Sequence, residues 1–250
     1  MRLATLALGL SALALATTAA HANSFTNGDF STNGGAGQFN YGGSNQTTAT
    51  GWYVGGSNGV GSNGYTFVTT AALAASGTPN SQYGGNISWW DKSNGGVGTI
   101  TSSPTGGFFI AQDSAYESAA LNQDITGLKL GKTYTVGFDW AIAQQNGFTG
   151  PTYDAWQVSL GGGAAQSTTT HNLANHDFNG WWHVSFSFVA NSTNETLSFL
   201  AAGGPGGLPP FAFLDGVTFT PDTVATPEPG TLALLGLGGL GLAVVARRRK

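Results

Sequence analysis

Residues 133–140, TYTVGFDW, carry an apolar side chain at every second position. Tyr134, Val136, Phe138 and Trp140 alternate with threonine, glycine and aspartate. Successive side chains of a β-strand point to opposite faces of a sheet. This spacing therefore predicts a strand with one face in a core and the other in water.

The same alternation recurs further along the chain. In WWHVSFSF, residues 181–188, it predicts an apolar face of Trp182, Val184, Phe186 and Phe188 and a polar face of Trp181, His183, Ser185 and Ser187. Residues 195–200 and 211–220 repeat the pattern, and weaker strand candidates lie at 64–70, 86–90, 107–112, 120–125 and 154–160. Helical spacing is approached only around Ala71, and the Gly-, Ser- and Asn-rich tract 32–64 predicts a long loop. We expect an all-β fold: a single antiparallel β-sandwich of the jelly-roll type over residues 23–220.

Composition narrows the functional classes. The chain has 250 residues, 12% of them aromatic, and no cysteine. Disulfides, thiol catalysis and thiolate metal sites are excluded, and the aromatic content favours a packed core over disorder. Of the 8 cationic residues only Lys92, Lys129 and Lys132 lie between the two ends, whereas almost all of the 12 acidic residues do. A domain this acidic repels nucleic acid, which we therefore do not expect as a partner.

The first 22 residues resemble a secretory signal peptide in their layout. Arg2 is followed by an apolar stretch and then by Ala20 and Ala22, which flank one residue in the small-x-small pattern of a signal-peptidase site. We expect cleavage before Asn23 and export of the remainder.

The other end combines three elements. Residues 221–230 form a proline-bearing linker, residues 231–246 carry no charge, and residues 247–250 are basic. The uncharged segment would span about 24 Å as a helix, which is less than the roughly 30 Å of a bilayer core. It can therefore cross a membrane only if the flanking cations reach the headgroups and the bilayer thins locally. We expect a transmembrane helix over 231–246, whose cytoplasmic end is fixed by Arg247, Arg248, Arg249 and Lys250.

Pro227, Glu228 and Pro229, followed by that apolar segment and the basic terminus, resemble the PEP-CTERM sorting signal of Gram-negative bacteria. The resemblance implies recognition by an exosortase-type transpeptidase. It also implies transient residence in the inner membrane, then transfer to the cell surface or the exopolysaccharide matrix. Simple permanent anchoring is the alternative, although an anchor needs no Pro-Glu-Pro.

Two short stretches resemble the first and last strands of galactose-binding-like jelly rolls, which include many carbohydrate-binding modules. These are NGDFS, residues 27–31, and FAFLDGVTF, residues 211–219, although Ser31 stands where the family often has glutamate. The resemblance implies a structural calcium ion held by Asp215 together with Asn27 or Asp29. Alternation places Asp215 on the same strand face as Phe213, Val217 and Phe219. A buried carboxylate there needs a partner, so the alternative is that it accepts hydrogen bonds from backbone N–H groups.

Aromatic residues on a polar face are candidate platforms for sugar rings. Trp181 and His183 occupy such a face, and Trp52 follows a glycine in the loop tract. The alternative is ordinary packing, which is the commoner use of large aromatic residues. These residues define the carbohydrate-platform hypothesis.

No catalytic motif carries its required context in this chain, so we expect a protein that is not an enzyme. A glycoside hydrolase or lyase is the enzymatic alternative, with two opposed carboxylates drawn from Asp113, Glu117, Asp139 and Asp154. A purely structural matrix protein is the other alternative. The sequence as a whole favours an exported surface or matrix protein with a β-sandwich that binds polysaccharide.

Overall fold

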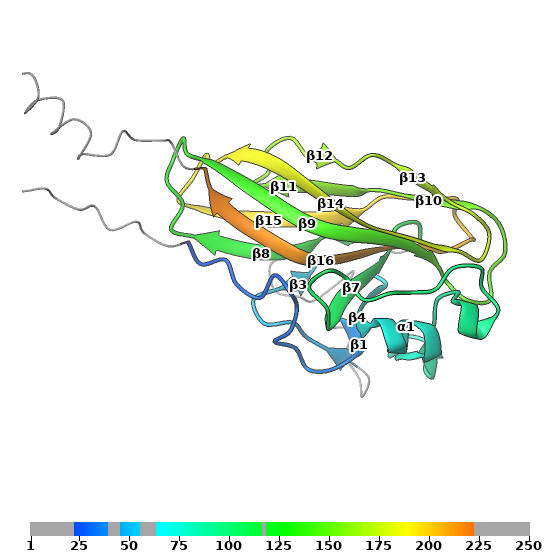
Figure 1. The fold of residues 1–250 in the computed structure, drawn as a ribbon. Coiled ribbons are helices and arrows are strands. Elements are labelled where there is room, and N and C mark those ends of the chain that lie inside the picture. Colours follow the sequence, from blue (N-terminus) through cyan, green and yellow to red (C-terminus); the bar gives the residue numbers. More distant parts are fainter. Residues whose placement is uncertain (1–22, 40–45, 56–63, 117–118, 223–250) are drawn as a thin grey trace, which may run out of the picture.

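The computed structural model describes residues 23–39, 46–55, 64–116 and 119–222. Two β-sheets face one another in a sandwich, which confirms the predicted all-β class (Figure 1). The strands pair antiparallel, except that β1 and β2 run parallel.

The larger sheet has seven strands, in the order β14 (Phe178–Val189), β9 (Thr133–Gln144), β16 (Pro210–Pro221), β7 (Phe108–Asp113), β4 (Thr66–Thr70), β1 (Gly37–Phe39) and β2 (Gln46–Thr47). The smaller sheet has five, in the order β12 (Gln166–Ser167), β11 (Trp156–Leu160), β15 (Asn194–Ala201), β8 (Leu121–Thr126) and β3 (Tyr53–Val54). Two ribbons of two strands complete the fold: β10 (Thr152–Asp154) with β13 (His171–Leu173), and β5 (Thr78–Pro79) with β6 (Asn86–Ile87). The short helices α1 (Ala71–Ser76) and η1 (Lys92–Asn94) follow β4 and β6.

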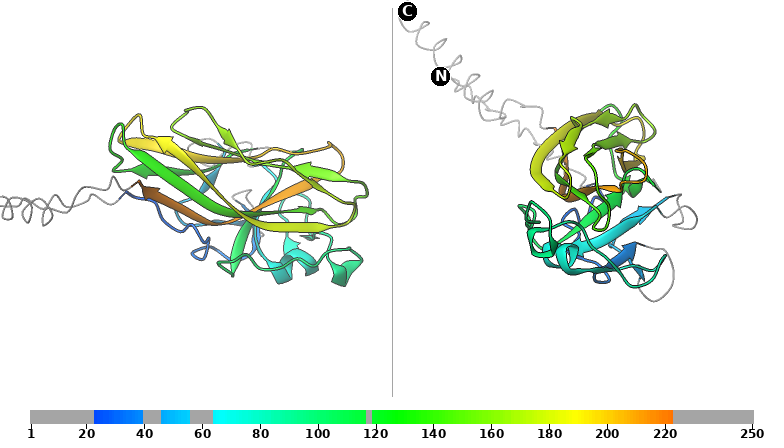
Figure 2. Two further views of the ribbon diagram at one scale, coloured as in Figure 1. Left: turned by 45° about the horizontal axis from the view of Figure 1, so that its top comes forward. Right: turned by 90° about the vertical axis from the view of Figure 1, so that its right-hand side faces the viewer.

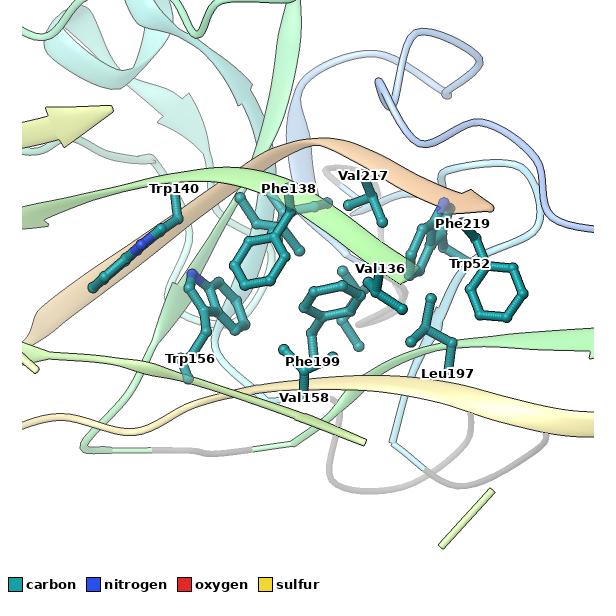
Figure 3. Close-up of a cluster of buried hydrophobic side chains, with 14 of the residues drawn as sticks. Trp52, Val136, Phe138, Trp140, Trp156, Val158, Leu197, Phe199, Val217 and Phe219 are labelled. Carbon is teal, nitrogen blue, oxygen red and sulfur yellow. The ribbon is translucent and has the colours of Figure 1, made fainter. Parts of the chain in front are cut away.

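The first hydrophobic core fills the space between the two sheets (Figure 3). It contains all four apolar residues of the TYTVGFDW stretch, as their alternation predicts. Phe138 packs edge-on against Phe199 of β15, with ring centroids 5.2 Å apart. Trp156 of β11 is also fully buried here, and its ring nitrogen donates to the carbonyl oxygen of Phe213.

A second core covers the opposite face of the seven-stranded sheet, and it corrects the expectation that this face meets water. Ala141 and Ala143 of β9 are fully buried there beside Phe211 and Phe213 of β16. Residues 71–105 run across this face, and their Trp89 is fully buried against the same phenylalanines. The seven-stranded sheet is therefore apolar on both sides over much of its length. Figure 2 shows the covering segment, with its short helices, along one side of the sandwich.

A β-bulge in β16 corrects the predicted position of Asp215. Asp215 pairs with Asp139, whereas Thr218 pairs with Gly137, so β16 carries one extra residue at this point. Gly216 accommodates it with φ +59, a left-handed conformation in which a side chain would be strained. Phe213 consequently faces the second core, while Val217 and Phe219 face the first. Asp215 does not share a face with all three, as strict alternation predicts.

Both described ends of the chain lie at one end of the sandwich (Figure 1). The backbone N–H of Ser24 donates to Thr126 O at the end of β8, and that of Asp222 donates to Thr133 O at the start of β9. We call this end, where residue 222 leaves the sheet, the tail end.

Several sequence predictions meet a different outcome. The tract 32–64, predicted as a loop, contributes β1, β2 and β3, and the candidate strand 86–90 shrinks to β6. The expected signal peptide, the linker from residue 223 onward, the membrane helix and the basic terminus lie outside the described residues. No helix among the described residues has the length and apolar character needed to cross a bilayer.

Candidate functional site

A pocket of about 520 Å³ lies at the end of the seven-stranded sheet opposite the tail end. Tyr65 precedes β4, Asp113 ends β7, Gln145 follows β9 and Pro209 precedes β16, and all four line it. The antiparallel register brings these positions to one edge of the sheet. Since β16 has twelve residues, the pocket and the tail end are about 40 Å apart.

Aromatic side chains form much of the pocket wall. Tyr83 and Tyr116 are exposed by 60% and 62%, and their hydroxyl oxygens are 2.9 Å apart, within hydrogen-bond distance. Tyr65 packs edge-on against Tyr83 with centroids 5.8 Å apart, and Phe148 contributes a further ring to the lining. Tyrosines of this kind present an apolar ring face together with a hydroxyl group that can form hydrogen bonds.

Two buried polar side chains hold the exposed tyrosines in place. Asn80 Oδ1 accepts hydrogen bonds from the backbone N–H groups of Gln82 (3.1 Å) and Tyr83 (3.3 Å), and its Nδ2 donates to the Tyr65 hydroxyl at 2.7 Å. Asp113 Oδ1 accepts from the N–H groups of Ala115 (2.8 Å) and Tyr116 (3.0 Å). Each tyrosine therefore sits on a turn fixed by a side chain from the sheet end, which pre-organises the pocket.

Polar groups with free hydrogen-bonding capacity also line the pocket. Asn86 and Gln145 line it, and among the described residues neither side-chain amide has a hydrogen-bond partner. Each amide offers two donor hydrogens and an acceptor oxygen. Apolar ring faces beside free amides match the two sides of a sugar, which has apolar C–H faces and peripheral hydroxyl groups.

A second buried carboxyl group lies near Asp113. Asp154 of β10 is 1% exposed, and burial raises its pKa well above the usual range. The neighbouring Ser114 hydroxyl opposes this rise, whereas the charge of Asp113 adds to it. The charge of Asp113 therefore adds to burial in favouring the neutral form of Asp154.

The carboxylates predicted for a hydrolase do not form an opposed pair across this pocket. Of the described ones, only Asp113 lines it. Asp139 lies on the sheet face, where its Oδ1 is 2.9 Å from His183 Nδ1. Glu117 lies outside the described residues.

Asp215 occupies a second polar cluster, beneath residues 103–105. It is fully buried, and its Oδ2 accepts hydrogen bonds from the hydroxyls of Ser103 and Thr105, the latter at 2.5 Å. Its Oδ1 has no hydrogen-bond partner within the described part of the chain, and Asp139 is its direct cross-strand neighbour. Burial raises the pKa of Asp215 to about 6, and the charge of Asp29 contributes to the rise.

The surroundings of Asp215 fit a calcium ion in part. A buried carboxylate oxygen without a partner, a second carboxylate nearby and two hydroxyl groups are the hard oxygen donors that Ca²⁺ prefers. No group of three or more His, Asp or Glu side chains in the described part of the chain is arranged to hold a metal ion.

Asn27 does not fit that ligand set. Its side-chain oxygen accepts from Thr32 N, and its side-chain nitrogen donates to the carbonyls of Thr32 and Thr50. Its own carbonyl accepts from Trp52 Nε1 and Phe30 N. Both oxygens are engaged in closing the loop, so Asn27 clamps the first turn of the domain.

The structure buries one of the three residues predicted as a sugar platform. Trp52 is 4% exposed in the first core, where its ring centroid lies 5.3 Å from that of Phe30, so no ligand can stack on it. Trp181 is half-buried against Phe109 in the second core, and its Nε1 donates to Thr101 O. His183 alone keeps an exposed side chain, 65% accessible, and it is paired with Asp139.

The outer face of the five-stranded sheet offers a different kind of surface. A groove of about 780 Å³ lies at its end, and polar residues and glycine make up most of its lining. Asp124 Oδ1 accepts from the Tyr53 hydroxyl and from Thr196 Oγ1, and Ser198 Oγ donates to Asn122. These groups satisfy one another, and no aromatic residue lines the groove. The end pocket is the better candidate for a ligand.

Comparison with known proteins gives one family match. No curated protein sequence matches this chain. Solved structures that resemble the fold include a carbohydrate-binding module in complex with β-1,4-galactotriose (17% identity, TM-score 0.38, 80% of this chain and 99% of the other). A xylan-binding domain from Paenibacillus barcinonensis (10%, 0.33, 76% and 94%) and a mannan-recognising module (15%, 0.34, 69% and 90%) also resemble it. These TM-scores are too low to transfer a ligand or a residue role to this chain. Residues 225–250 match the family model of the PEP-CTERM protein-sorting motif, so the chain carries that motif at the position its Pro-Glu-Pro predicts.

Proposed function

We propose that this protein is an exported, non-enzymatic carbohydrate-binding protein. In this proposal its PEP-CTERM tail directs it to the cell surface or the exopolysaccharide matrix, and its sandwich holds a glycan in the end pocket. The observation that carries the binding part is the pocket of about 520 Å³, within the size range of small-molecule sites, with pre-set tyrosines and free amides.

The sorting part rests on the matched motif. An exosortase-type transpeptidase is the proposed partner, with the inner membrane as a transient location before transfer. Replacing Pro227, Glu228 and Pro229 together with alanine tests it, by cell fractionation and mass spectrometry of the protein's C-terminus. We expect the wild-type tail to be shortened and the variant to keep it and stay with the membrane. An identical fate for both would remove this part of the proposal.

Orientation supports the combination of the two parts. Residue 222 leaves at the tail end, and the pocket lies at the opposite end of β16. A protein attached through its tail would thus present the pocket away from the attachment point. Binding there leaves the sorting signal free, and sorting leaves the pocket free.

Single alanine substitutions at Tyr83 and Tyr116 test the binding site. Binding to a panel of polysaccharides is measured by affinity electrophoresis, followed by titration calorimetry on those that bind. Loss of either ring should weaken binding by about tenfold, which corresponds to about 1.4 kcal/mol. Tyr53→Ala is the matched control, because Tyr53 lies on the five-stranded sheet beside Asp124. If Tyr53→Ala abolishes binding and the pocket variants retain it, the site lies on that sheet.

A structural matrix protein without a ligand is the competing function. It predicts that the wild-type protein binds no polysaccharide while retaining normal sorting. A hydrolase or lyase would instead shorten the bound polysaccharide during prolonged incubation. Size-exclusion chromatography of the glycan after incubation distinguishes that outcome from simple binding.

We further propose a structural calcium ion at Asp215 and Asp29, with the hydroxyls of Ser103 and Thr105 nearby. The buried, unpartnered Oδ1 of Asp215 supports this. Such an ion would fasten the N-terminal segment to β16, where Gly28 O already accepts a hydrogen bond from Val217 N at 2.8 Å.

A further inference from the structure

The described residues that line the end pocket carry negative charge and no positive charge. The described residues that line it include no lysine, arginine or histidine, and the one charged residue among them is Asp113. Lys129 and Lys132 lie in the turn before β9 at the tail end, where Lys132 Nζ donates to Asp222 O. An anionic group entering the pocket would therefore meet no compensating cation from the described residues that line it.

Asp113 is placed to repel such a group. It is 1% exposed, and two backbone N–H groups donate to its Oδ1, which is the acceptor role of an ionised carboxylate. Burial weakens solvent screening of its charge, so a second carboxylate in the pocket would be opposed more strongly than on an open surface. The same charge raises the pKa of Asp154 behind it, so the neighbouring carboxyl already responds to Asp113.

The uncharged groups of the pocket match hydroxyls instead. Asn86 and Gln145 can each donate to and accept from a sugar hydroxyl, and the mutually hydrogen-bonded hydroxyls of Tyr83 and Tyr116 also line the pocket. None of these uncharged groups attracts the hydroxymethyl group of a neutral sugar more strongly than the carboxylate of a uronate. Repulsion by Asp113 is therefore what would distinguish the two sugars.

Resting on the proposed function, we infer that the end pocket selects neutral sugar residues and rejects uronate residues, with Asp113 as the residue that sets this specificity. The protein would then attach to the neutral component of a mixed matrix and leave its polyanionic component, uronans and DNA, unbound.

The test uses pairs of glycans that differ only in charge. Oligosaccharides of galacturonate, glucuronate and mannuronate are compared with their carboxyl-reduced forms, which keep the linkage and become neutral. Binding to the full chain in mild detergent is measured with EDTA present, so that calcium cannot bridge carboxylates. We expect the neutral member of any pair that binds to bind about tenfold or more tightly, a difference of about 1.4 kcal/mol.

Two further measurements separate charge from shape. Asp113→Asn should narrow the difference between the pair members, whereas Asp222→Asn, which removes a charge at the tail end, should leave it unchanged. High salt should narrow the difference only slightly in the wild type, because the charge of a buried carboxylate is screened less than that of an exposed one. Equal or tighter binding of the uronate would overturn the inference while leaving glycan binding intact. Failure of every glycan to bind would instead remove the proposed function.

Discussion

The protonation of Asp215 makes a sharp prediction about stability and pH. Its pKa of about 6 in the folded protein exceeds the ordinary 3.8, because burial penalises the charged form. Between these two values the folded state holds a proton that the unfolded state has lost. The free energy of unfolding therefore falls as pH rises through this window. A shift of this size corresponds to about 3 kcal/mol, fully present below pH 4 and lost above pH 6.

Asp215→Asn isolates this contribution. Asparagine keeps the size and one acceptor oxygen for Ser103 and Thr105 but cannot ionise. Asp154 also has a raised pKa and Asp91 a lowered one, so the wild type alone mixes several titrations. The difference between wild type and variant is therefore the informative quantity. Urea unfolding from pH 4 to 8 in EDTA should show the wild type losing about 3 kcal/mol relative to the variant.

Adding calcium distinguishes protonation of Asp215 from binding of a calcium ion to it. An ion bound only by the folded state at one hundred times its Kd would add about 2.7 kcal/mol at neutral pH. That gain should appear in the wild type and vanish in Asp215→Asn. Parallel pH profiles for the two proteins in EDTA would refute the reasoning about burial. An equal calcium effect in both would place any bound calcium elsewhere.

Three other experiments test packing and orientation. Gly28→Ala would put a Cβ 1.9 Å from Val217 O, so thermal unfolding should show a loss of about 1–3 kcal/mol, whereas Gly206→Ala, in open space, should be neutral within about 0.5 kcal/mol. Phe199→Ala should cost about 3–5 kcal/mol in urea unfolding, because it opens a cavity in the first core; a loss below 1 kcal/mol would contradict that packing. Since the chain has no cysteine, Leu130→Cys and Gly206→Cys allow coupling to a surface at the tail end or beside the pocket. Only the Leu130-coupled protein should capture a glycan, and equal capture by both would contradict the pocket's position.

Period-two alternation was sufficient to predict β9 and β14, two long strands that contribute to the first core. In β9 and β14 each apolar residue on the predicted face packs into or against that core. The opposite face of β9 was mispredicted because its contacts involve small residues, Ala141 and Ala143, which alternation does not mark as buried. The covering segment 71–105 has no regular spacing of apolar residues that could predict its burial. Its buried residues Trp89 and Ile100 lie outside any helix or strand.

The bulge and the pocket depend on features that a local pattern does not contain. Gly216 is the only sign of the extra residue in β16, and glycine is too common in this chain for one to be diagnostic. Tyr83 and Tyr116 lie in separate turns, and their meeting depends on Asn80 and Asp113 reaching back to the backbone of those turns. The Asn–Ser–Gln–Tyr and Asp–Ser–Ala–Tyr spacings were the available signals, because Asn and Asp commonly fix a turn through the N–H groups that follow.

The segment 71–105 links the fold to the proposed site. By covering the seven-stranded sheet with Trp89 and Ile100, it removes that face as a ligand platform and draws Trp181 into packing. The same segment supplies Tyr83 and Asn86 to the pocket wall, so the residues that close the sheet face also form a binding surface at its edge. Loss of the second core would therefore loosen the tyrosine wall while leaving the first core in place. Glycan binding should therefore be lost at a lower denaturant concentration than the sheet structure of the first core, which far-UV circular dichroism follows.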